Sequence, residues 1–459
     1  MKSRANVLEA PWSGPEVRSG GACARRFAWA VLAVAGAAVS LPALSGAVAA
    51  PPTQRVDLEE AIRLALGSDP ATVSAATSVS SAQADLLEAR GEWLPSLTVS
   101  SGYSNSSDER VDQATGRLVS ESYNAQITAS LELFAGGRRI AGNRAASADL
   151  EAAGADYRSQ TFQTILRTTE IFYEAAAAAD LHRLSEQRLE RARQQLTFAS
   201  TRFDVGTATS SDLLRAELEV GNAELSVLDA ESTLRNAALG LGRQIGMAFE
   251  VHPASSSLPE RAPRLPPRES LVEQAVRSSP AVIAAEAALR GRRADRLAGT
   301  SDYLPSATLS GGYDWFSFDF PPDERSWSLR LTASLPIFDG FEREAEVRRA
   351  TAREQLARAT ARDASIAVRV EVEAAVGEIE SAARGIEIAD HAKDLAQEDL
   401  RVLEERYQIG ATTILELQAS QVALTEAEAA TVRARQALGM AVARLEAVLG
   451  ERIEVGALE

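Results

Sequence analysis

The sequence predicts a mainly α-helical protein that also contributes strands to a membrane β-barrel. Three observations lead to this fold class: two long stretches of period-2 alternation, long proline-free runs with heptad spacing, and a duplication of the whole pattern. We therefore expect each chain to have four transmembrane strands and a set of long coiled-coil helices, arranged as two structural repeats.

The alternation is clearest from Tyr123 to Leu133, where apolar and polar residues occupy opposite sides of an extended chain. A second such stretch runs from Trp327 to Leu335. Ordinary strands are mostly about five or six residues long, whereas a strand that crosses a bilayer needs about 9–11 residues. The expected water-facing positions are Asn124, Gln126, Ser328 and Arg330.

The first 49 residues have the features of a secretory signal peptide. Arg25 and Arg26 precede an apolar run from Phe27 to about Leu44, and small residues at 47–49 offer a cleavage site. An N-terminal membrane anchor is the alternative. The single Cys23 lies in this segment, so we expect no disulfide in the mature chain.

Charge argues against a nucleic-acid partner. The 459 residues carry a formal net charge of −16, and removal of residues 1–49 makes the remainder more acidic. No basic stripe with interleaved aromatic residues is present in the sequence.

The first repeat is expected over residues 50–252. Two short helices precede a β-hairpin at about 96–134, whose residues 104–122 are predicted to form a polar loop. Long helices follow over about 138–246, with a turn near Gly206.

The second repeat is expected over residues 269–459, because the motifs of the first recur in register. Tyr303-Leu304-Pro305-Ser306 follows Trp93-Leu94-Pro95-Ser96 by 210 residues, and Arg406-Tyr407-x-x-Gly410 follows Arg202-Phe203-x-x-Gly206 by 204. This repeat predicts a hairpin at about 306–338, with a loop six residues shorter, and long helices at about 341–450. The segment 253–268 between the repeats holds five prolines and reads as an extended linker.

Heptad spacing in the proline-free runs predicts that the long helices pair. Large and small apolar residues alternate three and four positions apart, which allows close knobs-into-holes packing. The predicted seam in the last helix consists of Leu417, Ser420, Leu424, Ala427, Thr431, Ala434, Leu438, Ala441 and Leu445. A coiled coil without a pore would satisfy this spacing equally well.

Four strands cannot close a barrel, and hydrocarbon does not tolerate open sheet edges. Several chains must therefore share one barrel, and three chains would supply twelve strands. Aromatic residues are expected at both ends of the strands, as in membrane barrels. They are Tyr103, Tyr123, Tyr313, Trp315 and Trp327 at the loop end, and Trp93, Phe134, Tyr303 and Phe338 at the helix end.

Over nearly all of the mature chain, this pattern resembles the TolC-like outer-membrane efflux proteins. The duplicated strand openings, Leu335 to Gly340 at the second strand-to-helix junction, and the paired R-F/Y-x-x-G turns carry the resemblance. It implies a homotrimer in outer-membrane lipid, with a twelve-stranded barrel continued by a helical periplasmic tunnel. It also implies partners: a periplasmic adaptor protein and an inner-membrane transporter.

The resemblance further assigns candidate site residues at the two turns. It implies a periplasmic gate at Asp212, Tyr407 and Glu416. The adaptor-docking tips that it implies are Phe203, Gly206 and Gly410. Thr412 and Ala419 depart from the gate residues of some members, so the links that close this gate are expected to differ.

No motif in the sequence indicates catalysis, a cofactor or a resident metal. His182, His252 and His391 have no Cys or His at ligand spacing, and no phosphate-binding glycine loop precedes a suitable helix. We therefore expect no enzyme, and the resemblance implies a passive exit duct of a tripartite efflux or type I secretion system. An exported coiled-coil structural or adaptor protein without a pore is the alternative, and an exported hydrolase is a weaker third. The transported substrate cannot be read from the sequence.

Overall fold

The computed structural model describes residues 54–111, 118–254 and 258–453. The expected signal peptide and its cleavage site lie outside these ranges. No helix within them is long and apolar enough to cross a membrane.

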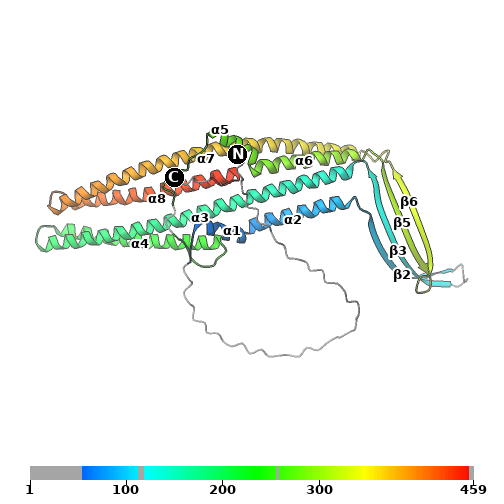
Figure 1. Ribbon diagram of the computed structural model, residues 1–459. Coiled ribbons are helices and arrows are strands. Elements are labelled where there is room, and N and C mark those ends of the chain that lie inside the picture. Colours follow the sequence, from blue (N-terminus) through cyan, green and yellow to red (C-terminus); the bar gives the residue numbers. More distant parts are fainter. Residues whose placement is uncertain (1–53, 112–117, 255–257, 454–459) are drawn as a thin grey trace, which may run out of the picture. The chain divides into compact units, whose positions relative to one another are not determined.

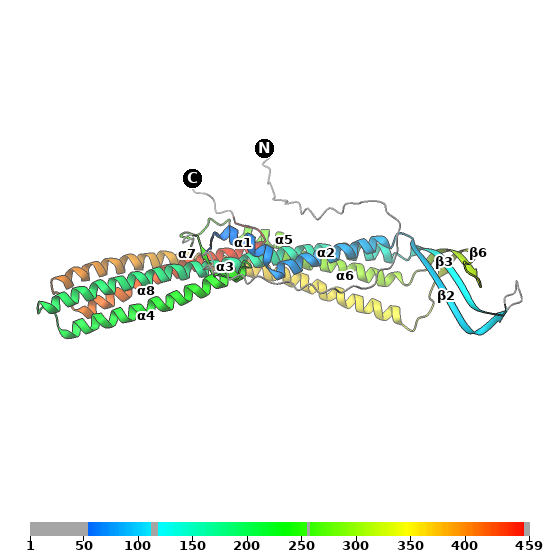
Figure 2. The same ribbon diagram turned by 90° about the horizontal axis from the view of Figure 1, so that it is seen from below.

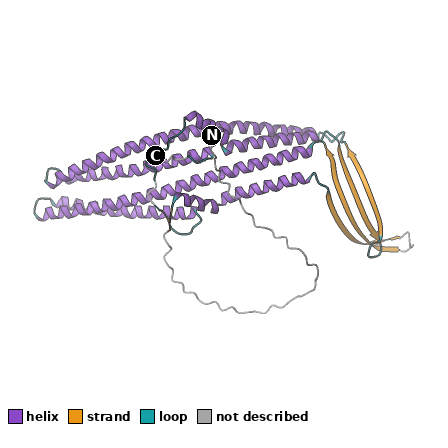
Figure 3. Ribbon diagram, viewed as in Figure 1, coloured by secondary structure: helices purple, strands orange, loops and turns teal. Residues whose placement is uncertain are grey.

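Four strands form one antiparallel sheet (Figure 3). They are β2 (Ser96–Val111), β3 (Leu118–Ala135), β5 (Ser306–Ser317) and β6 (Glu324–Ser334), and their order in the sheet is β2-β3-β5-β6. The two hairpins thus pair through β3 and β5, while β2 and β6 are the edges of the sheet.

The two faces of the sheet differ in polarity. Val99, Ile127, Tyr313 and Trp327 stand opposite one another in register on one face. The next level, on the other face, consists of Ser100, Gln126, Asp314 and Ser326. The predicted alternation is confirmed, because the register carries it across all four strands.

The first hairpin is longer than the sequence predicted. The prediction of a polar loop over 104–122 was wrong, since β2 continues to Val111 and β3 begins at Leu118. Ser104 pairs with Ser122 and Asn105 with Glu121 before the register shifts. Ser and Asn favour turns when alone, but the backbone hydrogen bonds of a partner strand hold them in an extended conformation here.

The two repeats have matching helices. In the first they are α1 (Leu58–Ser68), α2 (Pro70–Gly91), α3 (Arg138–Asp204) and α4 (Ser210–Gln244). In the second they are α5 (Arg268–Ser278), α6 (Pro280–Ser301), α7 (Glu342–Gln408) and α8 (Ile414–Leu449). Both α3 and α7 contain 67 residues, a length of about 100 Å.

All four connections between strands and helices leave from the same end of the sheet. Ala135 pairs with Ser306, and Ser306 pairs with Ser334, so these chain ends lie side by side. The adjoining helices keep the order of the strands, with α2 against α3, α3 against α6, and α6 against α7 (Figures 1 and 2).

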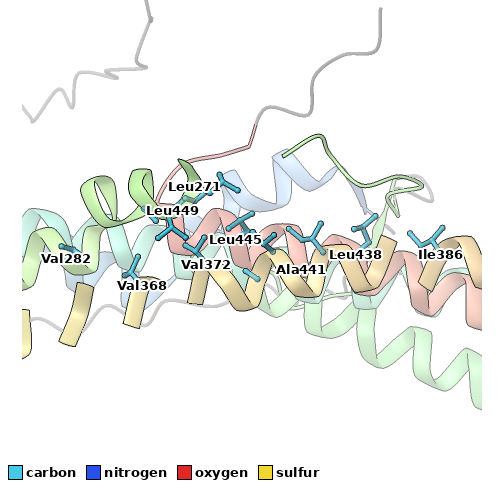
Figure 4. Close-up of a cluster of buried hydrophobic side chains, with 14 residues drawn as sticks. Leu271, Val282, Val368, Val372, Ile386, Leu438, Ala441, Leu445 and Leu449 are labelled. Carbon is cyan, nitrogen blue, oxygen red and sulfur yellow. The ribbon is translucent and has the colours of Figure 1, made fainter. Parts of the chain in front are cut away.

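Each repeat has a core of its own. In the second repeat, Val372 and Ile386 of α7 pack with Leu438 and Leu445 of α8 within a larger buried cluster (Figure 4). In the first repeat, Phe172 and Leu241 pack with residues of α1 and of two short parallel strands. These strands are β1 (Gln54–Val56) and β4 (Val251–Pro253).

The heptad seam predicted for α8 is largely buried. Its buried members are Leu417, Ser420, Leu424, Thr431, Leu438, Ala441 and Leu445. Besides the contacts of β3 with β5 and of α3 with α6, the two repeats meet where α3 packs on α8. The segment before α5 is not a free linker throughout, because Leu258 is buried against Ala176, Ala177 and Val432.

Candidate functional site at the helical turns

The turns that join α3 to α4 and α7 to α8 have the same backbone geometry. Gly206 has φ of 77° and Gly410 has φ of 78°, in the left-handed region that favours glycine. The N–H of Thr207 donates to the carbonyl of Arg202 at 2.8 Å, and that of Ala411 to the carbonyl of Arg406 at 2.8 Å. These bonds close each helix end, so both predicted tip glycines are explained as caps.

The two candidate acidic gate residues, Asp212 and Glu416, each cap the first turn of a helix. The Asp212 N–H donates to Thr209 Oγ1 at 3.2 Å, and the Thr209 N–H donates to Asp212 Oδ2 at 3.0 Å. Thr413 and Glu416 form the same reciprocal pair at 3.3 and 3.2 Å. This is the capping box, whose Thr-x-x-acid spacing is visible in the sequence.

Glu416 is exposed and keeps its charge at neutral pH. Hydrogen bonds from the Thr412 hydroxyl and the Thr413 N–H lower the pKa of Glu416. Asp212 is half-buried. Each turn therefore presents one carboxylate beside a helix N-terminus, where the helix dipole also stabilises negative charge.

Tyr407, the third candidate gate residue, lies inside the protomer. Its side chain is 5% exposed and packs against Phe198 at a ring-centroid distance of 5.9 Å. Burial raises the pKa of Tyr407. It belongs to a cluster with Ala199, Ala216 and Leu417, which joins the two repeats near their turns.

Arg202 links the two turns, and sequence reasoning did not single it out. Its Nη1 donates to the carbonyl of Tyr407 at 2.8 Å, and its Nη2 donates to the carbonyl of Thr207 at 3.3 Å. The guanidinium carbon lies 5.1 Å from the centroid of the Tyr407 ring. The paired R-F/Y-x-x-G motif was the available signal.

The counterpart Arg406 makes no side-chain hydrogen bond to any residue within 54–111, 118–254 and 258–453. The direct link between the two turns therefore comes from Arg202 of the first repeat. Just beyond the turns, Gln418 of α8 donates to the carbonyl of Arg215 of α4 at 3.3 Å, so the second repeat also contacts the first.

The tips also expose apolar side chains. Phe203 is 41% exposed, Val205 68% and Ile409 80%. These residues flank Gly206 and Gly410, so each turn presents a small apolar surface beside its carboxylate.

The described part of the chain contains no group of three or more His, Cys, Asp and Glu residues placed to hold a metal ion. His182 faces Glu186 at 3.8 Å, and His252 faces Glu250 at 3.8 Å. Each of these contacts places a single carboxylate beside an imidazole, and Glu250 also contacts Arg235 at 3.6 Å.

Comparison with known proteins identifies the family to which most of the chain is similar. Residues 61–247 and 271–451 match the profile of a family described as outer membrane efflux protein. Protein CyaE of Bordetella pertussis is 28% identical over 345 residues, which cover 72% of this chain and 71% of that protein. The pyoverdine export outer membrane protein OpmQ of Pseudomonas aeruginosa is 25% identical, over 86% of this chain and 84% of that protein.

A solved structure of CusC has the same fold. It superposes with a TM-score of 0.76 at 19% sequence identity, and the match covers 87% of this chain and 94% of CusC.

Proposed function

The chain belongs to the outer membrane efflux protein family, and from this premise we propose that three copies form a passive exit duct across the outer membrane. The sheet lies in the membrane and the helices lie in the periplasm. The observation that carries the proposal is the four-stranded sheet, which is apolar on one face, polar on the other and open at both edges.

The open edges support sharing of one barrel between copies. Unpaired backbone groups of β2 and β6 would cost several kcal/mol each in hydrocarbon. Pairing of β6 with β2 of the next copy satisfies both edges at once. The polar faces then line water, and the apolar faces meet lipid.

An uncovered stripe of leucines on α4 supports the same assembly. Its members, which we call the outer α4 stripe, are spaced as in a coiled coil and are largely exposed in one protomer. They are Leu214, Leu218, Leu225, Leu228 and Leu239, with exposed fractions of 64%, 65%, 62%, 60% and 43%.

The internal repeat indicates what covers the stripe. Val432 of α8 is the counterpart of Leu228, and it is buried against α3. Leu184 of α3 packs against the same cluster, whereas its counterpart on α7, Ile388, is 71% exposed. We infer that α4 of one copy packs on α7 of the next, as α8 packs on α3 within a copy.

The partners are a periplasmic adaptor and an inner-membrane transporter. The exposed apolar tips at Phe203, Gly206 and Gly410 support docking of the adaptor, because turns that project from a helical bundle suit contact with another protein. We assign the gate to the same end, with Asp212 and Glu416 as charged rim positions and Tyr407 as a packing residue behind them. The mechanism is opening of this end, without catalysis.

The first experiment is the native mass of the mature protein extracted from outer membranes in mild detergent, followed by single-channel conductance in planar bilayers. A trimer that conducts is expected. A water-soluble monomer or dimer obtained without detergent would contradict the proposal and favour the coiled-coil alternative.

A further inference from the structure

An arginine-lined pocket lies between α3 and α6, close to the end of the sheet. Its volume is about 410 Å³, within the usual range of small-ligand sites. The charged side chains that line it are Arg144, Glu151, Arg290 and Arg293, so positive charge exceeds negative charge.

The pocket lies on the same side of the molecule as the apolar face of the sheet. Arg138 of α3 bonds Glu132 at 2.8 Å, and Glu132 belongs to the polar face. At about 100° per residue, Arg144 and Glu151 point roughly 220–240° away from Arg138 around α3. If the polar face lines the duct, the pocket faces outward.

The end of the pocket at Arg144 lies near the depth of the lipid headgroups, whereas its other end, at Glu151 and Arg290, lies farther from the sheet. Arg144 lies six residues beyond Arg138, about 9 Å along the helix, and the polar layer on each side of a bilayer is about 5–8 Å thick. Side chains on α3 tilt toward its N-terminus, which is the membrane end, and this tilt shortens the distance.

Aromatic residues mark the same level of the membrane. The guanidinium of Arg139 lies 4.4 Å from the centroid of the Trp93 ring, and Arg343 lies 4.9 Å from that of Tyr303. Trp and Tyr concentrate at the boundary between hydrocarbon and headgroups.

Apolar side chains lie between the pocket and the sheet. Ile140 is 47% exposed on the same side of α3, and Leu297 lines the pocket and is 47% exposed. The order outward from the sheet is therefore apolar residues first and arginines next, which matches the order of acyl chain and headgroup in a lipid.

The arginines that line the pocket differ in whether they form ion pairs with carboxylates. Arg290 pairs with Glu151 at 2.6 Å, and Arg293 lies 3.7 Å from Glu354. Arg144 is exposed and forms no ion pair with any residue that the structure describes. Its five guanidinium N–H donors remain available to phosphate oxygens.

We propose that Arg144 and Arg293 bind the phosphate of a phospholipid in the periplasmic leaflet of the outer membrane, with Ile140 and Leu297 against its acyl chains. The inference rests on the proposed function, because it requires the apolar face of the sheet to lie in a bilayer. The bound lipid would fix the depth at which the duct sits in the membrane.

The test uses the full mature protein, purified as a trimer in mild detergent. Short-chain dihexanoylphosphatidylglycerol is titrated, and its effect on the thermal unfolding midpoint is measured. The wild-type midpoint is expected to rise with lipid, and Arg144→Gln with Arg293→Gln is expected to weaken apparent affinity by about tenfold or more, because charge-assisted bonds to phosphate are lost.

Arg292→Gln is the matched control. Arg292 lies on the same helix, but it pairs with Asp295 at 2.9 Å and does not line the pocket. This variant should respond to the lipid as wild type does. Inorganic phosphate at the same concentration should have no effect, since it lacks the acyl chains that Ile140 and Leu297 contact.

The outcomes separate this inference from the proposed function. A trimer that conducts but shows no response to the lipid, or an unchanged response in the double variant, would overturn the lipid site alone. An equal response to inorganic phosphate would show a plain anion site and would also overturn it. Failure to form a trimer would instead contradict the proposed function.

Discussion

At the scale of single residues, Arg202 is the contact that ties the two helical turns of one protomer together. It combines two hydrogen bonds to backbone carbonyls with a position over the Tyr407 ring. A lysine cannot make both hydrogen bonds and the ring contact together, because its single ammonium lacks the planar, forked arrangement of donors of the guanidinium.

We expect Arg202→Ala, and to a lesser degree Arg202→Lys, to loosen the turns and raise the single-channel conductance measured in planar bilayers. Arg193→Ala is the control, since Arg193 makes an exposed ion pair with Glu224 at 3.0 Å. Such pairs contribute about 0–1 kcal/mol. If the Arg202 and Arg193 variants had equal conductance, the contact of Arg202 with the second turn would not be what keeps the channel end closed.

We expect the capping carboxylate of Glu416 to make the second turn sensitive to pH. Its hydrogen bonds lower the folded-state pKa below the ordinary value of 4.5, so the carboxylate stabilises the turn fully above that value. Protonation removes the stabilisation as the pH falls through the folded pKa.

We therefore expect amide exchange at residues 413–417, corrected for intrinsic rates, to become faster in wild type below about pH 4.5. In Glu416→Gln the corrected exchange should be faster at neutral pH and should not change over this range. A wild-type profile that is flat with pH would contradict a capping role for the ionised side chain.

The candidate site could be predicted only in part at this scale. The repeated motif predicted the turn positions Gly206 and Gly410. Their positive φ explains why glycine occupies both positions. The repeated motif marked the position of Arg202 but not its contacts, because its partners are the carbonyls of Thr207 and Tyr407, and the second of these is 205 residues away. Sequence spacing carries no record of such a contact.

At the scale of elements, alternation and heptad spacing were sufficient to place the strands and the long helices. The ends of the first hairpin could not be placed, because residues such as Ser104 and Asn105 have weak strand propensity and are held by their partner strand. Strand propensity is a property of a single residue, whereas the length of a strand also depends on the backbone of the partner strand with which it pairs.

Close packing between α3 and α8 depends on one glycine. A Cβ built at Gly439 would clash with Cε2 of the Tyr173 ring and would lie 2.8 Å from its Cδ2. We expect Gly439→Ala to destabilise the protein by about 1–3 kcal/mol through overpacking, measured by denaturant unfolding in detergent.

Gly154→Ala is the matched control for that change. Gly154 lies within α3, and a Cβ built there would have no neighbour within 4 Å. Better helix propensity should make this variant more stable, by up to about 1 kcal/mol. A Gly439 variant as stable as the Gly154 variant would show that the ring of Tyr173 yields easily.

At the scale of the whole molecule, the duplication was the strongest signal in the sequence. The duplication predicted a turn in each repeat and matching long helices. The structure confirms two structural repeats, in which α3 and α7 have equal lengths. The covering of the outer α4 stripe could not be predicted from one chain's sequence, because a leucine facing a neighbouring copy and a leucine facing its own core follow the same heptad spacing.

The outer α4 stripe provides a direct test of assembly. We expect Leu225→Asp with Leu228→Asp to prevent trimer formation, because two carboxylates would be buried without partners between α4 and the next copy. Native mass in mild detergent measures the effect. Thr233→Asp is the control, since Thr233 is exposed on α4 and lies outside the stripe. A stable trimer of the double variant would exclude this interface.

The separate cores of the two repeats have a consequence for biogenesis. The core built from Val56, Phe172, Leu241 and Val251 is drawn wholly from the first repeat, and the parallel pairing of β1 with β4 closes it at Pro253. A polypeptide that is translocated N-terminus first can complete this core before the second repeat has emerged. Folding during export can therefore proceed in two stages, with the core of the first repeat formed before that of the second.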